Sequence, residues 1–250
     1  MTDVLVTRPL EASQQLAAEL DAQGLSSIIM PLYTFAALPL SQEIPAVLSS
    51  AATRKLGVFT SPRAVEFGLS HIPSDQIKHF DFAVVGSATG AKLESAGYQA
   101  HLQARSGFTS EDLLQVPEIL SAPGEAVIFC APGGRKTLAE GLGDLGWKVT
   151  QLMVYERLPL APSPGEVEAL SNAENLLSVW TSISALKLAE ETLPANAWEK
   201  ILVSPALVIS SRIQHYLQQL GASRVELADG PGNPALLESI LRMTGRQEHN

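Results

Sequence analysis

Residues 57–67, GVFTSPRAVEF, contain the unit from which the fold can be worked out. The apolar run that ends at Phe59 is typical of a buried strand, and it stops at Thr60-Ser61-Pro62. Proline is tolerated in the first turn of a helix, and a serine just before it can accept hydrogen bonds from the free N–H groups. Apolar residues at 64, 65 and 67 then have helical spacing. The stretch therefore predicts a buried strand, a very short turn and a helix.

The same pattern of strand, turn and helix occurs along the whole chain, in one order and twice. Four pairs of stretches correspond: VLVTRPLEASQQLAAEL from Val4 with AVIFCAPGGRKTLAEGL from Ala126, GVFTSPRAVEF with SVWTSISALKL from Ser178, FAVVGSATGAKLESAGY from Phe82 with ALVISSRIQHYLQQLGA from Ala206, and GFTSEDLLQVPEIL from Gly107 with GPGNPALLESILR from Gly230. Strands that alternate with helices form right-handed βαβ units and a parallel sheet. Any α/β protein repeats this pattern to some extent, but matching turn residues in matching order favour an internal duplication.

Two extended segments interrupt the pattern, one in each half. PLYTFAALPL and QLMVYERLPL each follow the first unit of their half and end in Leu-Pro. Proline removes a backbone donor and favours sheet edges and connections. We therefore expect residues 31–40 and 151–160 to pair as hinge strands. Lobe two then comprises residues 41–150, and lobe one comprises residues 1–37 and 160–250 with both termini. The predicted fold class is α/β, with two similar lobes, each a parallel sheet flanked by helices, joined by a two-stranded hinge ladder.

The composition is that of a globular protein. Hydrophobic residues make up 46% of the 250 residues and charged residues 17%, which is too apolar for disorder. No apolar run reaches the roughly 18–20 residues that span a bilayer, and the opening residues lack the basic and long apolar segments of an export signal. The single Cys130 cannot form an internal disulfide, which fits a reducing compartment. We expect a cytoplasmic protein without a membrane partner and, in the absence of heptad repeats, a monomer.

The formal net charge of −9 argues against nucleic acid as the main partner. Binding to a nucleic-acid backbone requires a basic surface, because the affinity comes largely from neutralised phosphates. A small anion held locally by a few groups remains compatible with this charge.

Six turns between a strand and a helix form the candidate site. Ligands of open parallel sheets lie beyond the carboxyl ends of the strands, where such turns meet. The turns are rich in hydroxyl groups and arginine and nearly free of carboxylates: Thr7-Arg8, Thr60-Ser61 with Arg63, Gly86-Ser87 with Thr89, Gly133-Gly134-Arg135, Ser182 with Ser184, and Ser210-Ser211-Arg212. Each turn alone is compatible with an ordinary N-cap. The six together predict a site for a carboxylate or phosphate ligand.

Cofactor and metal motifs are not found. VGSATG differs from the dinucleotide fingerprint, and APGGRKT lacks both the glycine just before the lysine and the earlier glycine of a phosphate-binding loop. The histidines are scattered along the chain, so no metal-ligand spacing is visible. Cys130 is expected to be a strand-end residue rather than a reactive thiol. The residues therefore give no support to a dinucleotide, phosphate-loop or metal site.

Tyr155 is the titratable residue that stands out. It lies in the second expected hinge strand, where the first has Phe35. A phenol that faces the site could donate a proton. An aromatic side chain that only packs at the hinge is equally consistent with the sequence.

Six motifs, in this order, carry a resemblance to a known family: LVTRP, FTSPRAVEF, VVGSATGAKLESAGY, GFTSEDLL, PGGRKTLAEGL followed by VYERLP, and WTSISALKLA. Together they resemble uroporphyrinogen-III synthase over nearly the whole chain. The resemblance implies two α/β lobes joined by a two-stranded ladder. It also implies cyclisation of the linear tetrapyrrole hydroxymethylbilane to uroporphyrinogen III, with loss of water, inversion of the last pyrrole ring through a spiro intermediate, and no cofactor. The bilane closes unaided to the uninverted isomer.

The resemblance also implies roles for the turns. Tyr155 matches the tyrosine considered as the acid for departure of the hydroxyl group. The substrate carries eight carboxylates, which suit hydroxyl-rich helix starts. The residues expected to bind it are Thr7, Arg8, Thr60, Ser61, Arg63, Ser87, Thr89, Gly133, Ser182, Ser184, Ser210 and Ser211. Two departures from the family pattern concern local contacts: Ile183 replaces a proline or small polar residue, and Ala131-Pro132 replaces a glycine-rich approach.

A second hypothesis belongs to another class of protein. A non-catalytic bilobal binding protein for a polycarboxylate ligand would have the same hinge strands and the same hydroxyl-rich helix starts. Such a protein would close on its ligand without chemistry.

Overall fold

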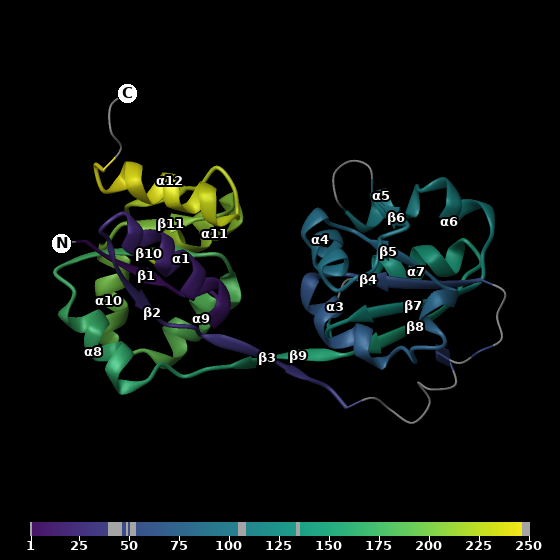
Figure 1. The fold of residues 1–250 in the computed structure, drawn as a ribbon. Helices are drawn as coiled ribbons and strands as arrows, with labels where there is room; N and C mark the ends of the chain where they lie inside the picture. The colour runs from purple at the N-terminus through teal and green to yellow at the C-terminus, as the bar shows by residue number, and fades with distance from the viewer. Residues whose placement is uncertain are drawn as a thin grey trace. The chain divides into compact units, whose positions relative to one another are not determined.

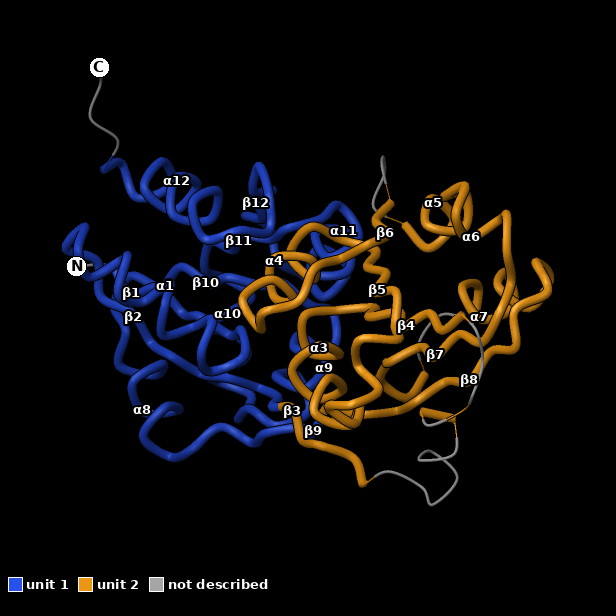
Figure 2. The backbone as a smooth tube through the Cα atoms, turned by 45° about the vertical axis from the view of Figure 1, so that its right-hand side comes forward, with its two compact units in different colours: residues 1–34, 158–250 blue, residues 35–157 orange. Residues whose placement is uncertain are grey.

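The chain forms two compact units in the computed structural model, which describes residues 2–39, 47–48, 50, 54–104, 109–133 and 136–246. Unit 1 contains Met1–Thr34 and Leu158–Asn250, and unit 2 contains Phe35–Arg157 (Figure 2). Each unit has its own parallel sheet with helices on it (Figure 1). No helix in the described part of the chain is long and apolar enough to cross a membrane.

The sheet of unit 2 has the strand order β6-β5-β4-β7-β8, with parallel neighbours. Its strands are β4 (Lys55–Phe59), β5 (Phe80–Val84), β6 (Leu102–Gln103), β7 (Glu125–Cys130) and β8 (Lys148–Met153). Its helices are α3 (Pro62–Gly68), the short 3₁₀ turns Leu69–His71 and Ile77–His79, α4 (Ser87–Ser95), α5 (Ser110–Leu114), α6 (Pro117–Ser121) and α7 (Thr137–Asp144).

Alternation along β4 explains why both faces of this sheet are covered. Leu56 and Val58 pack into the core that includes side chains of α5, α6 and α7. Phe59 packs into the opposite core, which includes side chains of α3 and α4. Gly57 lies on this second side, where a Cβ would stand 2.9 Å from the ring of Phe82. Side chains of successive strand residues point to opposite faces, so a strand that is buried on both faces carries apolar side chains on both. The missing side chain of Gly57 leaves room for the ring of Phe82.

Unit 1 has the strand order β12-β11-β10-β1-β2, again with parallel neighbours. Its strands are β1 (Thr2–Val6), β2 (Ser26–Ile29), β10 (Asn175–Trp180), β11 (Ala206–Val208) and β12 (Val225–Leu227). Its helices are α1 (Leu10–Ala22), α8 (Pro164–Asn172), α9 (Ile183–Thr192), α10 (Ala195–Val203), α11 (Ser211–Gln219) and α12 (Asn233–Met243). Leu16 of α1 and Leu236 of α12 pack with Val4 and Val179 in one core.

The two sheets have the same order once the paired sequence stretches are aligned. β1 corresponds to β7, β10 to β4 and β11 to β5, and each set occupies the same place in its sheet. The predicted fold class of two similar α/β lobes with parallel sheets is confirmed. An internal duplication explains this match, because two independent sheets would not share strand order and turn chemistry together.

A two-stranded ladder of β3 (Tyr33–Ala37) and β9 (Tyr155–Pro159) links the units. Leu38 N–H donates to Val154 O at 3.0 Å, and Leu160 N–H donates to Leu32 O at 2.8 Å, so the strands run antiparallel. The structure places residues 151–153 of the expected hinge strand in β8 instead. Val154 N–H donates to Cys130 O, which extends the sheet of unit 2 almost to Tyr155.

Glu125, the first residue of β7, is held by hydrogen bonds at the amino end of the unit-2 sheet. Its Oε1 accepts a hydrogen bond from Lys148 Nζ at 2.8 Å, and its Oε2 accepts one from the Ser50 hydroxyl. The hydrogen bond from Lys148 Nζ, with that from Ser50, holds the pKa of the Glu125 carboxyl below its usual value. Hydrogen bonds to the charged form have this effect.

Glu125→Gln should reduce the amount by which the free energy of unfolding falls at low pH. A pKa lowered by folding contributes stability above the unfolded pKa, which is about 4.3 for glutamate. That stability is lost as the pH falls through the lower folded value. Urea unfolding at a series of pH values should give a shallower fall of the unfolding free energy for Glu125→Gln than for the wild type. An equal fall in both proteins would contradict this account, and Lys148→Met should act in the same direction as Glu125→Gln.

Candidate functional site

A cavity of about 500 Å³ lies at the carboxyl end of the unit-2 sheet. The turn after β4, the end of β7, the start of α5, helix α7 and strands β8 and β9 all contribute to its wall. Its lining residues are Thr60, Ser61, Val85, Thr109, Ser110, Ile128, Cys130, Ala131, Leu138, Ala139, Gln151 and Tyr155. This is the edge of the sheet at which open α/β proteins bind ligands.

The turn after β4 supplies two hydroxyl groups. Thr60 Oγ1 donates to Phe129 O at 3.1 Å, which ties the turn to the neighbouring strand β7. Ser61 is the N-cap of α3, and its Oγ accepts a hydrogen bond from Ala64 N–H at 3.1 Å. Pro62 then occupies the first turn of the helix. The sequence therefore folds here as its turn residues predict.

Tyr155 is held on three sides and is only 8% exposed. Its ring stacks on Phe67 of α3, with centroids 5.7 Å apart and planes at 21°. Phe35 of β3 meets it edge-on at 5.7 Å and 73°. Its Oη lies 3.0 Å from Ser61 Oγ. Aromatic pairs prefer such offset and edge-on arrangements, so the phenol has one fixed orientation in the cavity wall.

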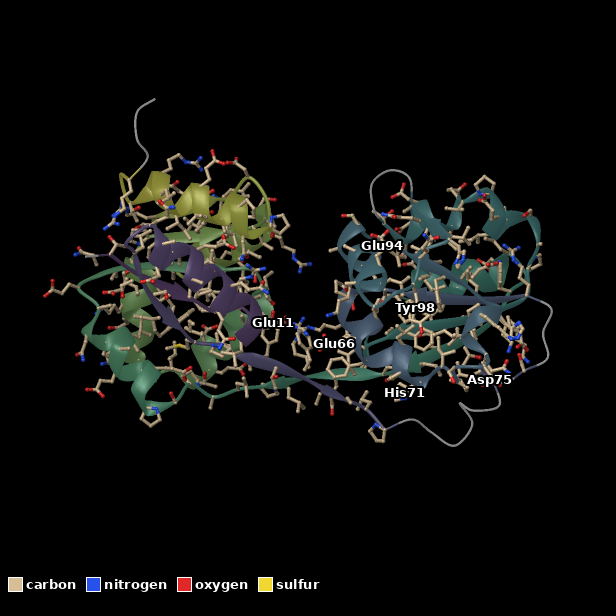
Figure 3. All side chains as sticks on the ribbon, viewed as in Figure 1. Glu11, Glu66, His71, Asp75, Glu94 and Tyr98 are labelled. Atoms are coloured by element: carbon tan, nitrogen blue, oxygen red, sulfur yellow. The ribbon has the colours of Figure 1, made fainter. Side chains whose placement is uncertain are left out.

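Positive charge lies close to this aromatic group. The guanidinium groups of Arg63 and Arg157 lie 5.1 Å and 5.9 Å from the centroid of the Phe35 ring. Arg63 also forms an ion pair with Glu66, which lies one turn further along α3. Glu66 is labelled in Figure 3. A substrate carboxylate that binds Arg63 therefore has to compete with an existing ion pair.

The start of α5 adds two further hydroxyl groups to the cavity. Thr109 forms a capping box with Asp112: its N–H donates to Asp112 Oδ2 at 3.1 Å, and its Oγ1 accepts from Asp112 N–H at 3.2 Å. Ser110 follows as the first helical residue. Sequence reasoning missed both, although the spacing Thr109-x-x-Asp112 is the signal of a capping box.

The apolar part of the cavity lining comes mainly from β7 and α7. Ile128, Leu138 and Ala139 lie there together with Cys130. Burial raises the pKa of the Cys130 thiol, so the thiol stays protonated at neutral pH. This agrees with the expected role of Cys130 as a strand-end residue. The cavity thus offers both hydroxyl groups and apolar side chains.

Gln151 also lines the cavity and was missed as a site residue. It precedes Leu152, which packs on the α3 and α4 side of the sheet. Alternation along β8 therefore turns Gln151 to the side of α5 and α7, where the cavity lies. The sequence pattern had placed this residue in a hinge strand, which hid its position.

Several predicted residues of unit 2 lie elsewhere. Thr89 is buried in α4 at 3% exposure, and Ser87 is the first residue of that helix, whose N-cap is Gly86. Gly133 has a φ of +72°, a conformation that glycine adopts without strain. Gly134 and Arg135 lie outside the described residues.

The predicted residues of unit 1 divide into helix caps and buried groups. Ser182 caps α9 and accepts from Ser184 N–H at 3.2 Å, and Ser210 caps α11 and accepts from Ile213 N–H at 3.4 Å. Ser211 is the first residue of α11. Thr7 is 1% exposed and donates to Val179 O at 2.9 Å, which gives its hydroxyl group a structural partner.

Arg8 follows Thr7 and is tied to the start of α12. Its Nη1 donates to Asn233 Oδ1, and Asn233 Nδ2 donates to Glu19 Oε1 at 3.0 Å. Burial lowers the pKa of the Arg8 guanidinium, although arginine stays charged at neutral pH. The side chain is thus partly used for packing α12 against the turn after β1.

No group of three or more histidine, cysteine, aspartate or glutamate side chains that could hold a metal occurs among the described residues. The cavity itself offers hydroxyl groups, one amide and one protonated thiol. Neutral oxygen donors of this kind suit hydrogen bonding to carboxylates, not tight coordination of a transition metal.

Comparisons with known proteins agree on one family. The family described as uroporphyrinogen-III synthase HemD matches residues 14–238. The uroporphyrinogen-III synthase of Escherichia coli is 28% identical over 246 residues, which cover 95% of this chain and 99% of that protein. The enzyme of the same name from Salmonella typhimurium is also 28% identical, over 248 residues and with the same coverage.

Solved structures show the same fold. The uroporphyrinogen-III synthetase of Helicobacter pylori has a TM-score of 0.64 and 19% identity, over 97% of this chain and 100% of that chain. A mutant uroporphyrinogen III synthase from Thermus thermophilus has a TM-score of 0.58 and 18% identity, over 99% of this chain and 100% of that chain.

Proposed function

The chain belongs to the uroporphyrinogen-III synthase family, and from this premise we propose that it cyclises hydroxymethylbilane to uroporphyrinogen III with inversion of the last pyrrole ring. The cavity of unit 2 is the observation that carries the proposal. Its hydroxyl groups suit the carboxylate side chains of a pyrrole ring, and its apolar side chains suit the ring itself. Tyr155 contributes the phenol of this lining, and we assign it the role of the acid.

The proposed reaction begins with departure of the hydroxyl group. The phenol of Tyr155 gives its proton to the hydroxyl group of the bilane, which leaves as water. An azafulvenium cation remains on the substrate, and a phenolate remains on the protein. A positioned acid of this kind lowers the barrier by about 2–5 kcal/mol.

The remaining steps rearrange carbon–carbon bonds. The cation forms a bond to the substituted α-carbon of the last ring, which gives the spiro intermediate. The older bond of that carbon to its methylene bridge then breaks, and the methylene carbon bonds to the unsubstituted α-carbon. That carbon loses its proton to the phenolate, which restores Tyr155. The overall change is the loss of one water molecule.

In this proposal the choice of the inverted isomer depends mainly on the geometry in which the protein holds the bilane. The uninverted isomer forms without catalysis, so the protein has to hold the bilane in the one geometry that leads to the spiro carbon. We assign carboxylate binding to Thr60, Arg63, Thr109 and Ser110 in unit 2, and to Ser182, Ser184, Ser210 and Ser211 in unit 1. Binding through Thr60 or Thr109 requires the hydroxyl hydrogen to turn to the carboxylate from its present acceptor, which is Phe129 O for Thr60 and Asp112 Oδ2 for Thr109. The buried Thr7 and Thr89 are assigned to the support of their turns.

We further propose that the hinge ladder separates two lobes. Lobe one comprises residues 1–37 and 160–250, and lobe two comprises residues 41–150. The protein is expected to act as a cytoplasmic monomer, with a small-molecule substrate and without a nucleic-acid or membrane partner. Sedimentation of the purified protein measures the oligomeric state.

The rival hypothesis of a binding protein is tested by turnover. Freshly generated hydroxymethylbilane is mixed with protein at a concentration far below that of the substrate. An enzyme should accelerate consumption of the whole substrate pool, at a rate proportional to protein concentration. Consumption at the uncatalysed rate, or protection of an amount of bilane equal to the protein, would favour the binding protein.

A further inference from the structure

Helix α3 holds Tyr155 at both ends of its side chain. Phe67, near the end of the helix, stacks on the ring. Ser61, the N-cap, places its Oγ 3.0 Å from the phenol oxygen. The contact is short enough for a hydrogen bond between two hydroxyl groups, and either can donate in the resting protein.

The donors and acceptors of the Ser61 hydroxyl group decide whether Ser61 or Tyr155 donates this hydrogen bond during the reaction. A serine hydroxyl has one hydrogen and two lone pairs. One lone pair accepts the N–H of Ala64 at 3.1 Å, which fixes the orientation of Oγ at the helix start. The hydroxyl hydrogen is left to turn towards Tyr155. After Tyr155 has given up its proton, its oxygen has no hydrogen, so the bond persists only with Ser61 as donor.

We propose that Ser61 is the positioning residue of Tyr155, donating a hydrogen bond to the phenol oxygen and stabilising the phenolate formed when the hydroxyl group departs. This inference rests on the proposed function and assigns Ser61 a role other than substrate binding. Two features support it. The Oγ atom is already fixed by the helix start, so little order is lost in making the bond. A hydrogen bond to a charged oxygen is also stronger than one to a neutral oxygen.

The test is a double-mutant cycle of Ser61→Gly and Tyr155→Phe, with kcat and KM measured for each protein. Glycine is nearly as good an N-cap as serine, so Ser61→Gly removes the hydroxyl group with little loss of the helix start. In the Tyr155 background it should lower kcat about ten- to a hundredfold, the size of one hydrogen bond to a charged group. KM should change much less. In the Tyr155→Phe background it should leave kcat nearly unchanged.

Two further variants separate this role from a structural one. Ser61→Thr keeps both the hydroxyl group and the cap, and it should retain most of kcat. Ser163→Gly removes the exposed N-cap serine of α8, which also accepts from a backbone N–H, and it should leave kcat unchanged. If Ser61→Gly does not fold, as judged by circular dichroism and thermal unfolding, the same cycle is run with Ser61→Ala and Ser61→Cys.

Three results would overturn the inference. They are an equal loss of kcat from the Ser61 change in both backgrounds, an effect on KM alone, and a wild-type kcat for Tyr155→Phe. The proposed function fails separately, if the wild-type protein forms no uroporphyrinogen III. If the wild-type protein forms uroporphyrinogen III but the effects of the two changes simply add, the role of Ser61 is refuted and the proposed function stands.

Discussion

Tyr155→Phe should lower kcat by about ten- to a thousandfold while KM changes little. Phenylalanine keeps the stacking on Phe67 and the edge-on contact with Phe35, so shape and packing stay the same. The proton donor is lost, together with the hydrogen bond between its hydroxyl group and Ser61. Interactions made only in the transition state affect kcat and not substrate binding, which is why the two constants should separate. Steady-state kinetics on freshly generated hydroxymethylbilane measures both.

Tyr98→Phe is the matched control for this change. Tyr98, which is labelled in Figure 3, also belongs to unit 2 and packs edge-on against Phe82, and it is not among the residues that line the cavity. Its loss of a hydroxyl group should leave kcat unchanged. A wild-type kcat in Tyr155→Phe, with unchanged thermal stability, would reduce Tyr155 to a packing residue and leave the reaction to positioning alone.

Ala139→Phe should lower kcat/KM by about a hundredfold or more. Ala139 lies on α7 in the apolar part of the cavity lining, and a phenyl group there occupies the space that we assign to a pyrrole ring. Ala139 lines the cavity and also packs against the core formed with α5, α6 and α7, so thermal unfolding has to show that the variant is folded. Displacement of a bound substrate by about an ångström is enough for a loss of this size.

Ala195→Phe controls for the added aromatic surface. Ala195 is exposed at the start of α10 in unit 1, outside the proposed machinery. Thermal unfolding of Ala195→Phe should lie close to the wild type, and that of Ala139→Phe shows whether this protein is folded. A wild-type kcat/KM in a folded Ala139→Phe protein would show that the cavity of unit 2 does not hold the substrate.

Much of the fold could be predicted because its signals are local. The residues Thr60-Ser61-Pro62 mark a strand end, a cap and a helix start within three positions, and the structure has all three there. The repetition of such turns in one order predicts two sheets of the same order. The hinge ladder was predicted for a similar reason, since proline limits where a strand can pair.

The site was harder to predict because it depends on distant neighbours. Thr7 has the same residue type and turn position as Thr60, yet it is buried at 1% exposure, and Thr89 is buried at 3% exposure inside α4. Which hydroxyl group faces a cavity depends on the strands and helices beside it, and these come from elsewhere in the chain. Ser110 and Gln151 line the cavity for the same reason, although neither belongs to the turns after β4, β5 or β7.

The isomer composition of the product tests the central claim most directly. Hydroxymethylbilane is converted with and without the protein, the products are oxidised to porphyrins, and the two isomers are separated by chromatography. We predict that uroporphyrin III dominates with the wild-type protein and that its share rises with protein concentration. Tyr155→Phe should form less of it, but the fraction formed enzymatically should still be the inverted isomer, because shape selects the inversion. Formation of the uninverted isomer alone at every protein concentration would contradict the account.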